Sequence, residues 1–280
     1  MEIKLAKKYG FCFGVKRAIR IAEKRPGAIT FGPLIHNERE IKRLEDNYDV
    51  FVQNDTDMVG ERQDVIIRTH GITRQDLEIL KNKNAQITDA TCPFVIKPQK
   101  IVEKMSKEGY GVIIFGDASH PEIKGVMSYA VSRPIVISSL EELKEKIDSQ
   151  EYFLDKKIAL ISQTTKQIKK FLEIAEFLMT KSYETRVFNT ICNATFDNQE
   201  AARELSQEVD IMIIVGGKTS SNTKQLLNIA QNHCKDSYLV QDEKDLDPQW
   251  FVGKKICGIT AGASTPDWIV KQVQEAIQKF

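Results

Sequence analysis

Short hydrophobic runs recur along the whole chain, each followed by small polar residues and then by an amphipathic stretch. Several runs, such as 112–115 and 211–215, are almost unbroken Val, Ile and Leu, which is typical of parallel strands covered on both faces. The pattern predicts twelve strands, at 2–5, 28–31, 50–53, 64–68, 86–88, 111–115, 135–138, 157–161, 184–188, 210–215, 238–241 and 255–260.

The stretches between these strands have the spacing of amphipathic helices. In the segment 166–179, for example, apolar residues recur every three or four positions and line one face. Several segments also begin after a residue that can cap a helix. The predicted caps are Asn37 for 37–44, Thr73 for 74–81, Thr165 for 166–179, Asn222 for 223–231, and Ser264 or Thr265, followed by Pro266, for the last helix.

Strands that alternate with helices predict an α/β fold with mainly parallel sheets. Twelve strands are too many for one comfortable open sheet, and they divide into three groups of about four. We therefore predict three small α/β domains. The first covers 1–91 and includes the N-terminal strand and Cys12, the second covers 92–191, and the third covers 192–280.

The charged residues nearly cancel, since 40 Lys and Arg stand against 39 Asp and Glu and the formal net charge is +1. This balance, without a long basic block, is not that of a chain built to coat nucleic acid or an anionic membrane. No apolar stretch approaches the roughly 20 residues that span a bilayer, and the start of the chain lacks the apolar core of a secretory signal. We expect a cytoplasmic protein that binds neither nucleic acid nor membrane.

Residues with useful chemistry stand just beyond the carboxyl ends of the predicted strands. Open α/β sheets bind ligands at this edge, where loops gather and helix N-termini point. If three such sheets turn these edges towards one another, the residues converge on one cavity. The candidates are His36, His70, Cys92, His120, Glu122, Thr164, Cys192, Ser220, Ser221, Asn222 and Ser264.

Five cysteines at wide and irregular spacing argue against a secreted disulfide framework. Cys12 follows the first predicted strand, Cys92 opens the second predicted domain and Cys192 opens the third. Three thiolates suit either zinc with an open position or an iron–sulfur cluster with one iron that no cysteine binds. The alternative is that each is a small buried apolar residue, the role that we assign to Cys234 and Cys257.

Anion binding is predicted between the strand at 210–215 and Asn222, where two glycines precede hydroxyl and amide side chains at a helix start. The spacing is not that of a P-loop. The segment around Ser264 repeats the pattern. Together with His36 and His70, these loops offer many donors and little net charge, which suits a diphosphate. Ordinary turn and cap chemistry is the alternative.

The sequence His120-Pro121-Glu122 places an imidazole and a carboxylate around a fixed turn. A carboxyl group buried in such a pocket has a raised pKa and can serve as a general acid. Metal ligation by the same pair is the competing use.

Eight motifs occur in one order along the chain: Gly-Phe-Cys-Phe-Gly-Val at 10–15, Arg-Thr-His-Gly at 68–71, Asp-Ala-Thr-Cys-Pro at 89–93, His-Pro-Glu at 120–122, Gln-Thr-Thr at 163–165, Cys192, Ser-Ser-Asn at 220–222 and Thr-Ala-Gly-Ala-Ser at 260–264. Together they resemble the hydroxymethylbutenyl diphosphate reductase family, also called IspH or LytB. The resemblance runs from residue 3 to about residue 272.

This resemblance implies three α/β domains in a pseudo-threefold trefoil around a central cavity. It also implies the last step of the methylerythritol phosphate route to isoprenoids, in which hydroxymethylbutenyl diphosphate loses its hydroxyl as water and gains two electrons. The products are isopentenyl and dimethylallyl diphosphates. Relatives take the electrons from ferredoxin or flavodoxin.

The resemblance further implies one 4Fe–4S cluster per chain, with three irons held by Cys12, Cys92 and Cys192 and a fourth without a cysteine ligand. Glu122 is then the proton donor, and Thr164 orients the substrate hydroxyl and relays protons. His120 also belongs to the catalytic set. The implied substrate-binding residues are His36, His70, His120, Thr164, Ser220, Ser221, Asn222 and Ser264.

Three other functions compete with this one. A quinolinate synthase also uses three cysteines in a three-domain trefoil, but the His-Pro-Glu and Ser-Ser-Asn motifs belong to the reductase pattern. A zinc-dependent phosphate-ester hydrolase would use Cys and His ligands. A non-enzymatic metal sensor would need an effector surface, and no DNA-binding segment or basic helix is visible. One departure from the family pattern is Gly217, where some relatives have serine.

Overall fold

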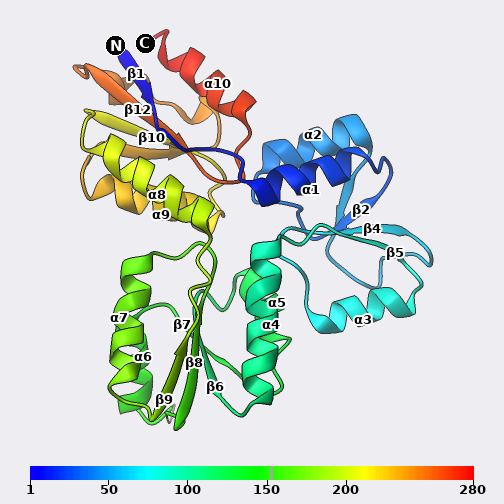
Figure 1. Cartoon of the computed structure of the whole chain (residues 1–280). Coiled ribbons are helices and arrows are strands. Elements are labelled where there is room, and N and C mark those ends of the chain that lie inside the picture. The colour runs from blue at the N-terminus through cyan, green and yellow to red at the C-terminus, as the bar shows by residue number, and fades with distance from the viewer. Residues whose placement is uncertain (152–153) are drawn as a thin grey trace. The chain divides into compact units, whose positions relative to one another are not determined.

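A computed structural model describes residues 1–151 and 154–280 of the chain (Figure 1). Every strand predicted from the hydrophobic pattern is present, with ends that differ by at most one residue. The strands are β1 (Glu2–Leu5), β2 (Ile29–Phe31), β3 (Phe51–Gln53), β4 (Asp64–Ile67), β5 (Gln86–Asp89), β6 (Gly111–Phe115), β7 (Ile135–Ile137), β8 (Lys157–Ser162), β9 (Glu184–Val187), β10 (Ile211–Val215), β11 (Ser237–Val240) and β12 (Ile256–Ala261).

Helices separate almost all of these strands. They are α1 (Phe13–Glu23), α2 (Glu38–Tyr48), α3 (Arg74–Asn82), α4 (Pro93–Lys107), α5 (Pro121–Met127), α6 (Leu140–Asp148), α7 (Ile168–Met179), α8 (Asn193–Ser206), α9 (Ser221–Gln231) and α10 (Asp267–Ile277), with short 3-10 turns at Glu243–Asp245 and Pro248–Phe251.

The strands form three four-stranded sheets, with the orders β1-β12-β10-β11, β3-β2-β4-β5 and β7-β6-β8-β9. Every strand pair is parallel. The predicted α/β class with three parallel sheets is therefore confirmed. In each sheet the strands leave their carboxyl ends on one edge, where the candidate loops begin.

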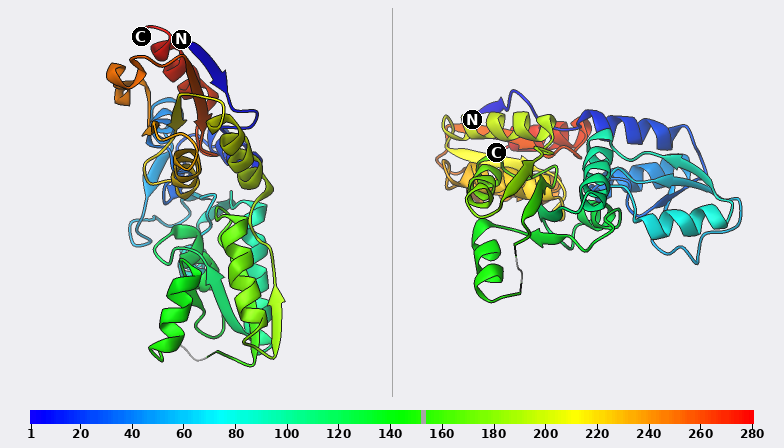
Figure 2. Two further views of the ribbon diagram at one scale, coloured as in Figure 1. Left: turned by 90° about the vertical axis from the view of Figure 1, so that its left-hand side faces the viewer. Right: turned by 60° about the horizontal axis from the view of Figure 1, so that its bottom comes forward.

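Alternating side chains of the central strands fill two apolar layers, one on each face of a sheet. In β10, Ile211, Ile213 and Val215 pack with residues of α10, whereas Met212 and Ile214 pack with residues of α8 and α9. The sheet of β6 and β8 is covered in the same way, by α6 and α7 on one face and by α4 and α5 on the other (Figures 1 and 2). Burial on both faces explains the continuous apolar runs.

The chain packs as two compact units. The first contains Met1–Glu23, Ile35–Asp49 and Asn193–Phe280, and thus the sheet of β1 and β12 with helices α1 and α2. The second contains Lys24–Leu34 and Val50–Cys192, and thus the other two sheets.

One part of the predicted first domain needs correction. The N-terminal strand β1 pairs with β12, from Glu2 beside Ile256 to Leu5 beside Ile259, so it belongs to the sheet of the C-terminal strands. Pairing between segments so distant in sequence leaves no local pattern. The boundaries at 91/92 and 191/192 stay a prediction.

Helix starts were predicted less well than strands. Asn37 and Thr73 cap α2 and α3 as expected, each accepting a hydrogen bond from a backbone N–H three residues on. The cap of α9 is Ser220, because Ser221 and Asn222 already lie in its first turn. Helix α7 starts after Gln167 and not after Thr165, and α10 starts after Pro266; neither Gln167 nor Pro266 makes a side-chain cap bond.

Candidate functional site

In the first unit, His36 and Ser264 come together at the carboxyl edge of the sheet. Ser264 follows β12, and its hydroxyl Oγ donates a hydrogen bond of 3.1 Å to the backbone carbonyl of His36. Gly217, in the turn after β10, lies against the same carbonyl, because a Cβ at this position would stand 2.4 Å from the His36 oxygen. The glycine therefore lets the His36 backbone approach the loop.

Asn222 has the environment of a ligand-binding side chain. It is 4% exposed, and neither its amide nitrogen nor its carbonyl oxygen has a hydrogen-bond partner in the described part of the chain. Buried polar atoms are almost always paired, so an exception calls for a partner from outside the chain. Ser220 caps the helix by accepting a bond of 3.3 Å from the Thr223 N–H. A helix N-terminus with these groups favours an anion such as phosphate.

In the second unit, the Glu122 carboxyl group is buried and held by one residue. It is 2% exposed. The backbone N–H of Thr164 donates to Oε1 over 2.8 Å, and the Thr164 hydroxyl donates to Oε2 over 2.7 Å. Burial raises the pKa of Glu122, and the two bonds from Thr164 offset part of that rise. A carboxyl group with a raised pKa keeps its proton to a higher pH than an ordinary glutamate and can serve as a general acid.

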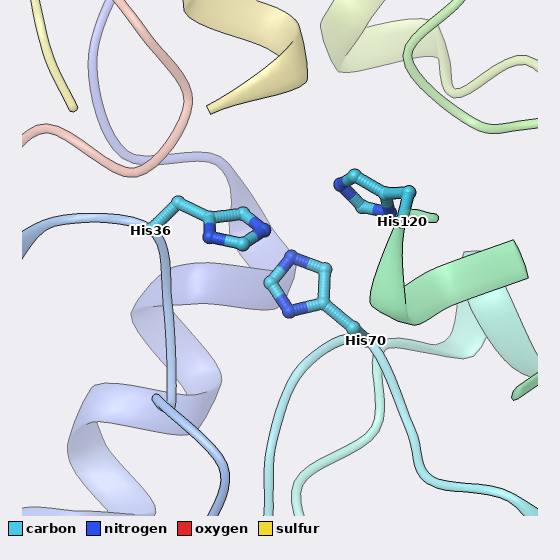
Figure 3. Close-up of side chains that lie close together, drawn as sticks. All are labelled: His36, His70 and His120. Atoms are coloured by element: carbon cyan, nitrogen blue, oxygen red, sulfur yellow. The ribbon is translucent and has the colours of Figure 1, made fainter. Parts of the chain in front are cut away.

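His120 lies at the start of the helix that carries Glu122. It is the N-cap of α5, and its Nδ1 accepts a hydrogen bond of 3.2 Å from the Glu122 N–H. A neutral imidazole that accepts at Nδ1 carries its proton on Nε2, so Nε2 is a donor. His70, in the loop after β4, packs its ring edge-on against His120, with ring centroids 5.4 Å apart (Figure 3).

The three cysteines predicted as ligands share one local arrangement. Each directly precedes a helix: Cys12 precedes α1, Cys92 precedes α4, and Cys192 precedes α8. Each also donates its backbone N–H to a loop beside a neighbouring strand. The acceptors are the carbonyls of Ala263 at 3.1 Å for Cys12, Thr69 at 3.0 Å for Cys92 and Thr164 at 2.9 Å for Cys192. The loops thus hold all three cysteines at strand ends, Cys12 in the first unit and Cys92 and Cys192 in the second.

Thiol chemistry separates these three from the other two cysteines. None of the five, all within the described residues, forms a disulfide, and Cys12, Cys92 and Cys192 are partly exposed. Cys234 and Cys257 are buried, and burial raises the pKa of Cys257 to about 12. A thiol that keeps its proton is a poor metal ligand. Partly exposed thiols at the positive ends of helix dipoles fit an anionic iron–sulfur cluster.

Sequence reasoning missed Lys166, which follows the Gln-Thr-Thr motif after β8. Its ammonium lies 5.3 Å from the centre of the Phe115 ring, and burial lowers its pKa. The positive charge of Lys166 also lowers the pKa of Glu122, although less than burial raises it. The available sequence signal for Lys166 was its position directly after the Gln-Thr-Thr motif. A lysine at that position is equally consistent with a solvated surface.

The structure thus groups the predicted site residues in two sets. His36, Ser220, Ser221, Asn222, Ser264 and Cys12 lie at one edge in the first unit, and His70, His120, Glu122, Thr164, Cys92 and Cys192 lie at strand ends in the second. No helix in the described residues is long and apolar enough to cross a membrane.

Parallel sheets whose strand ends offer thiols, a buried carboxyl group with a raised pKa and donors for an anion are typical of an α/β enzyme built around a metal centre. The family model described as LytB protein matches residues 3–278 of the chain. The chain belongs to this family, and membership implies an iron–sulfur cluster.

Relatives of known function support the assignment over the full length. The chain is 63% identical over 277 residues to the 4-hydroxy-3-methylbut-2-enyl diphosphate reductase of Helicobacter pylori (strain P12), covering 99% of both chains. It is 59% identical over 280 residues to the enzyme of the same name from Nitratiruptor sp., covering 100% of this chain and 99% of that one.

Two solved structures are also similar. One is a (E)-4-hydroxy-3-methyl-but-2-enyl diphosphate reductase, described as the terminal enzyme of the non-mevalonate pathway, with a TM-score of 0.70 and 38% identity over 100% of this chain and 99% of that one. The other is the reductase from Plasmodium falciparum, with a TM-score of 0.90 and 28% identity over 99% of this chain and 87% of that one. These matches set aside a quinolinate synthase, a zinc hydrolase and a metal sensor.

Proposed function

We propose that this chain converts hydroxymethylbutenyl diphosphate to isopentenyl and dimethylallyl diphosphates, with Glu122 as the proton donor. The activity is that of a 4-hydroxy-3-methylbut-2-enyl diphosphate reductase, the terminal enzyme of the non-mevalonate pathway. The substrate loses its hydroxyl group as water and takes up two electrons and two protons. The observation that carries the proton-donor role is the buried Glu122 carboxyl, held by both donors of Thr164.

The proposed cofactor is one 4Fe–4S cluster per chain, held by Cys12, Cys92 and Cys192. One iron is then left without a cysteine ligand. Such a cluster, when bound, supplies electrons one at a time and a Lewis-acidic iron for the substrate hydroxyl. The exposure and helix-end position of the three thiols support this set, and the burial of Cys234 and Cys257 supports their exclusion.

Proton delivery would pass from Glu122 through Thr164. Hydroxide is a poor leaving group, and protonation turns it into water. The raised pKa favours the protonated form of Glu122. In the structure the Thr164 hydroxyl donates to Oε2, so for the relay it would turn, accept the proton from protonated Glu122 and donate its own proton to the substrate hydroxyl. Thr164 also binds the amide of Cys192 through its own carbonyl, so one residue links the acid to a proposed cluster ligand.

The diphosphate would bind to groups that are mostly uncharged donors. His36, Ser220, Ser221, Asn222 and Ser264 would bind it from the first unit, and His70 and His120 from the second. The support is the unpartnered amide of Asn222, the helix start at Ser220 and the Nε2 donor of His120. A diphosphate anchored away from the reacting carbon fixes that carbon for reaction and so lowers the entropic part of the barrier.

The proposed electron donor is a ferredoxin or a flavodoxin. A cytoplasmic location remains a prediction. The absence of nucleic-acid and membrane binding is also a prediction, which the near-neutral charge supports.

An anaerobic assay tests the proposed function. The purified protein, reduced by a viologen radical, is incubated with hydroxymethylbutenyl diphosphate, and both alkenyl diphosphates are quantified. We expect both products, and we expect turnover to depend on bound iron. Protein that contains iron and forms neither product would overturn the proposal.

A further inference from the structure

An exposed aromatic side chain and a row of lysines extend from Cys92 along one side of α4. Phe94, in the first turn, is 42% exposed although it is a large apolar residue. Lysines follow at three- or four-residue spacing, which places them on one side of the helix. The exposed lysines are Lys97, Lys100, Lys104 and Lys107.

The positive charge on this helix is least compensated near Cys92. Lys104 and Lys107 pair with Glu108 and Glu103, at 3.8 Å and 2.8 Å. Lys97 and Lys100 have no ion-pair partner among residues 1–151 and 154–280. At about 1.5 Å per residue, Lys100 lies only about 12 Å along the axis from Cys92.

The same sequence of features occurs on α1 in the other unit. Cys12 is followed by Phe13, which is 66% exposed, and then by the exposed Lys16 and Arg20 on the same side of the helix. Isolated exposed aromatic residues are common. In the part of the chain that the structure describes, Lys16 and Arg20 also make no ion pair, so an aromatic residue followed by unpaired cations occurs at two of the proposed cluster ligands.

We propose that Phe94, Lys97 and Lys100 form the docking surface for an acidic electron-carrier protein. This inference rests on the proposed function, because the reaction consumes two electrons that the chain does not hold. A carrier that gives up one electron per encounter must dock twice per product, each time being oxidised by one electron. An exposed aromatic anchor beside cations that lack partners is suited to a partner with an acidic rim around its redox group. Docking here keeps the path to Cys92 short.

Charge reversal tests the docking surface. In Lys97→Glu/Lys100→Glu, we expect the KM for an acidic ferredoxin or flavodoxin to rise about tenfold or more at low salt, with a weaker salt dependence. Turnover with a reduced viologen stays at the wild-type level, because a small donor needs no protein docking. Phe94→Ala is expected to raise the KM for the carrier with both salt dependence and viologen turnover unchanged.

The matched control is Lys169→Glu/Lys170→Glu on α7, which makes the same change of charge at exposed positions of a helix that does not follow a cysteine. We expect the control to keep the wild-type KM for the carrier. Equal KM values for the carrier in the reversal variant and wild type, or equal losses with both donors, would overturn the docking surface. Inactivity of the wild-type protein with viologen would instead contradict the proposed function.

Discussion

Thr164 occupies a central position among the side chains of the second unit, because it bonds both the Glu122 carboxyl and the Cys192 backbone. Its N–H and hydroxyl hold the two carboxyl oxygens, and its carbonyl accepts the N–H of Cys192 at 2.9 Å. Three polar groups of one residue thus position the proposed acid beside a proposed ligand loop. The His-Pro-Glu and Gln-Thr-Thr motifs could be predicted as important from sequence, but their direct contact could not.

Glu122→Gln tests the acid. Glutamine keeps the size of the side chain and an oxygen for the Thr164 N–H, but it has no acidic proton. Turnover should fall about 10²- to 10⁴-fold, the usual contribution of general acid catalysis. Iron per chain and the binding constant for the diphosphate should stay near wild type. Turnover within about threefold of wild type would remove Glu122 from the acid role.

The raised pKa of Glu122 also predicts how stability changes with pH. The native state keeps a proton on Glu122 at pH values where the unfolded chain has lost it, so stability falls as pH rises above the ordinary glutamate pKa. The Glu122→Gln variant has no ionisable group at this position, so its stability should not fall with rising pH for this reason. In urea titrations under anaerobic conditions, we expect the stability of the variant relative to wild type to increase from pH 5 to pH 8.

Glu103→Gln is the control, because the pKa of Glu103 is shifted in the opposite direction to that of Glu122. The bond from Lys107 lowers the pKa of Glu103, so its contribution is present at neutral pH and is lost as pH falls. A difference between Glu122→Gln and wild type that stays constant over the pH range would contradict the raised pKa.

At the scale of elements, the helix α2 owes its position to a buried ion-pair network in the first unit. Glu40 is 1% exposed, and its carboxylate accepts bonds from Arg43 at 2.7 and 3.0 Å and from the indole N–H of Trp268 at 3.1 Å. Arg39 stacks on Trp268 and pairs with Asp242 at 2.6 Å. The network fastens α2 to α10, and the segment before α2 carries His36.

Trp268→Phe should loosen this attachment. Phenylalanine keeps an aromatic ring but leaves Glu40 Oε2 without the indole donor, at a cost of about 1–3 kcal/mol in the free energy of unfolding. We expect the KM for the diphosphate to rise more than kcat falls, because the proposed anion site depends on His36. Trp250→Phe is the control, since Trp250 stacks on Tyr238 with ring centroids 4.0 Å apart and supplies none of the hydrogen bonds that Glu40 accepts from Arg43 and Trp268. Equal KM values in both variants would contradict the positioning role.

The three cysteines that directly precede a helix are the proposed cluster ligands, and the other two are not. Serine at position 12, 92 or 192 should lower iron per chain to a small fraction of wild type, because each proposed ligand is lost separately. Cys234→Ser and Cys257→Ala should keep the wild-type iron content, since both residues are buried in packing. Iron and sulfide analysis of anaerobically purified protein measures this. Loss of iron in either control variant, with the fold retained by circular dichroism, would show that the ligand set is wrong.

For the whole molecule, the hydrophobic pattern predicted the strands well because burial on both faces of a parallel sheet leaves unbroken apolar runs, as in β10. It could not show that β1 pairs with β12, because that pairing joins the two ends of the chain. Helix starts such as that of α7 were misplaced because several residues after β8 can cap a helix, and tertiary packing decides among them. The candidate site residues could be chosen from the sequence because they recur at strand ends, and their roles stay predictions. Contacts such as that between Ser264 and the His36 carbonyl needed coordinates.

The central claim is that Cys12, Cys92 and Cys192 hold a single 4Fe–4S cluster with one iron free of cysteine. Mössbauer spectroscopy of ⁵⁷Fe-labelled protein, with and without hydroxymethylbutenyl diphosphate, tests it most directly. We predict about four irons per chain, one of which has parameters distinct from the other three and changes when the diphosphate is added. A spectrum with four equivalent irons that the diphosphate leaves unchanged, or active protein that contains zinc in place of iron, would contradict the account.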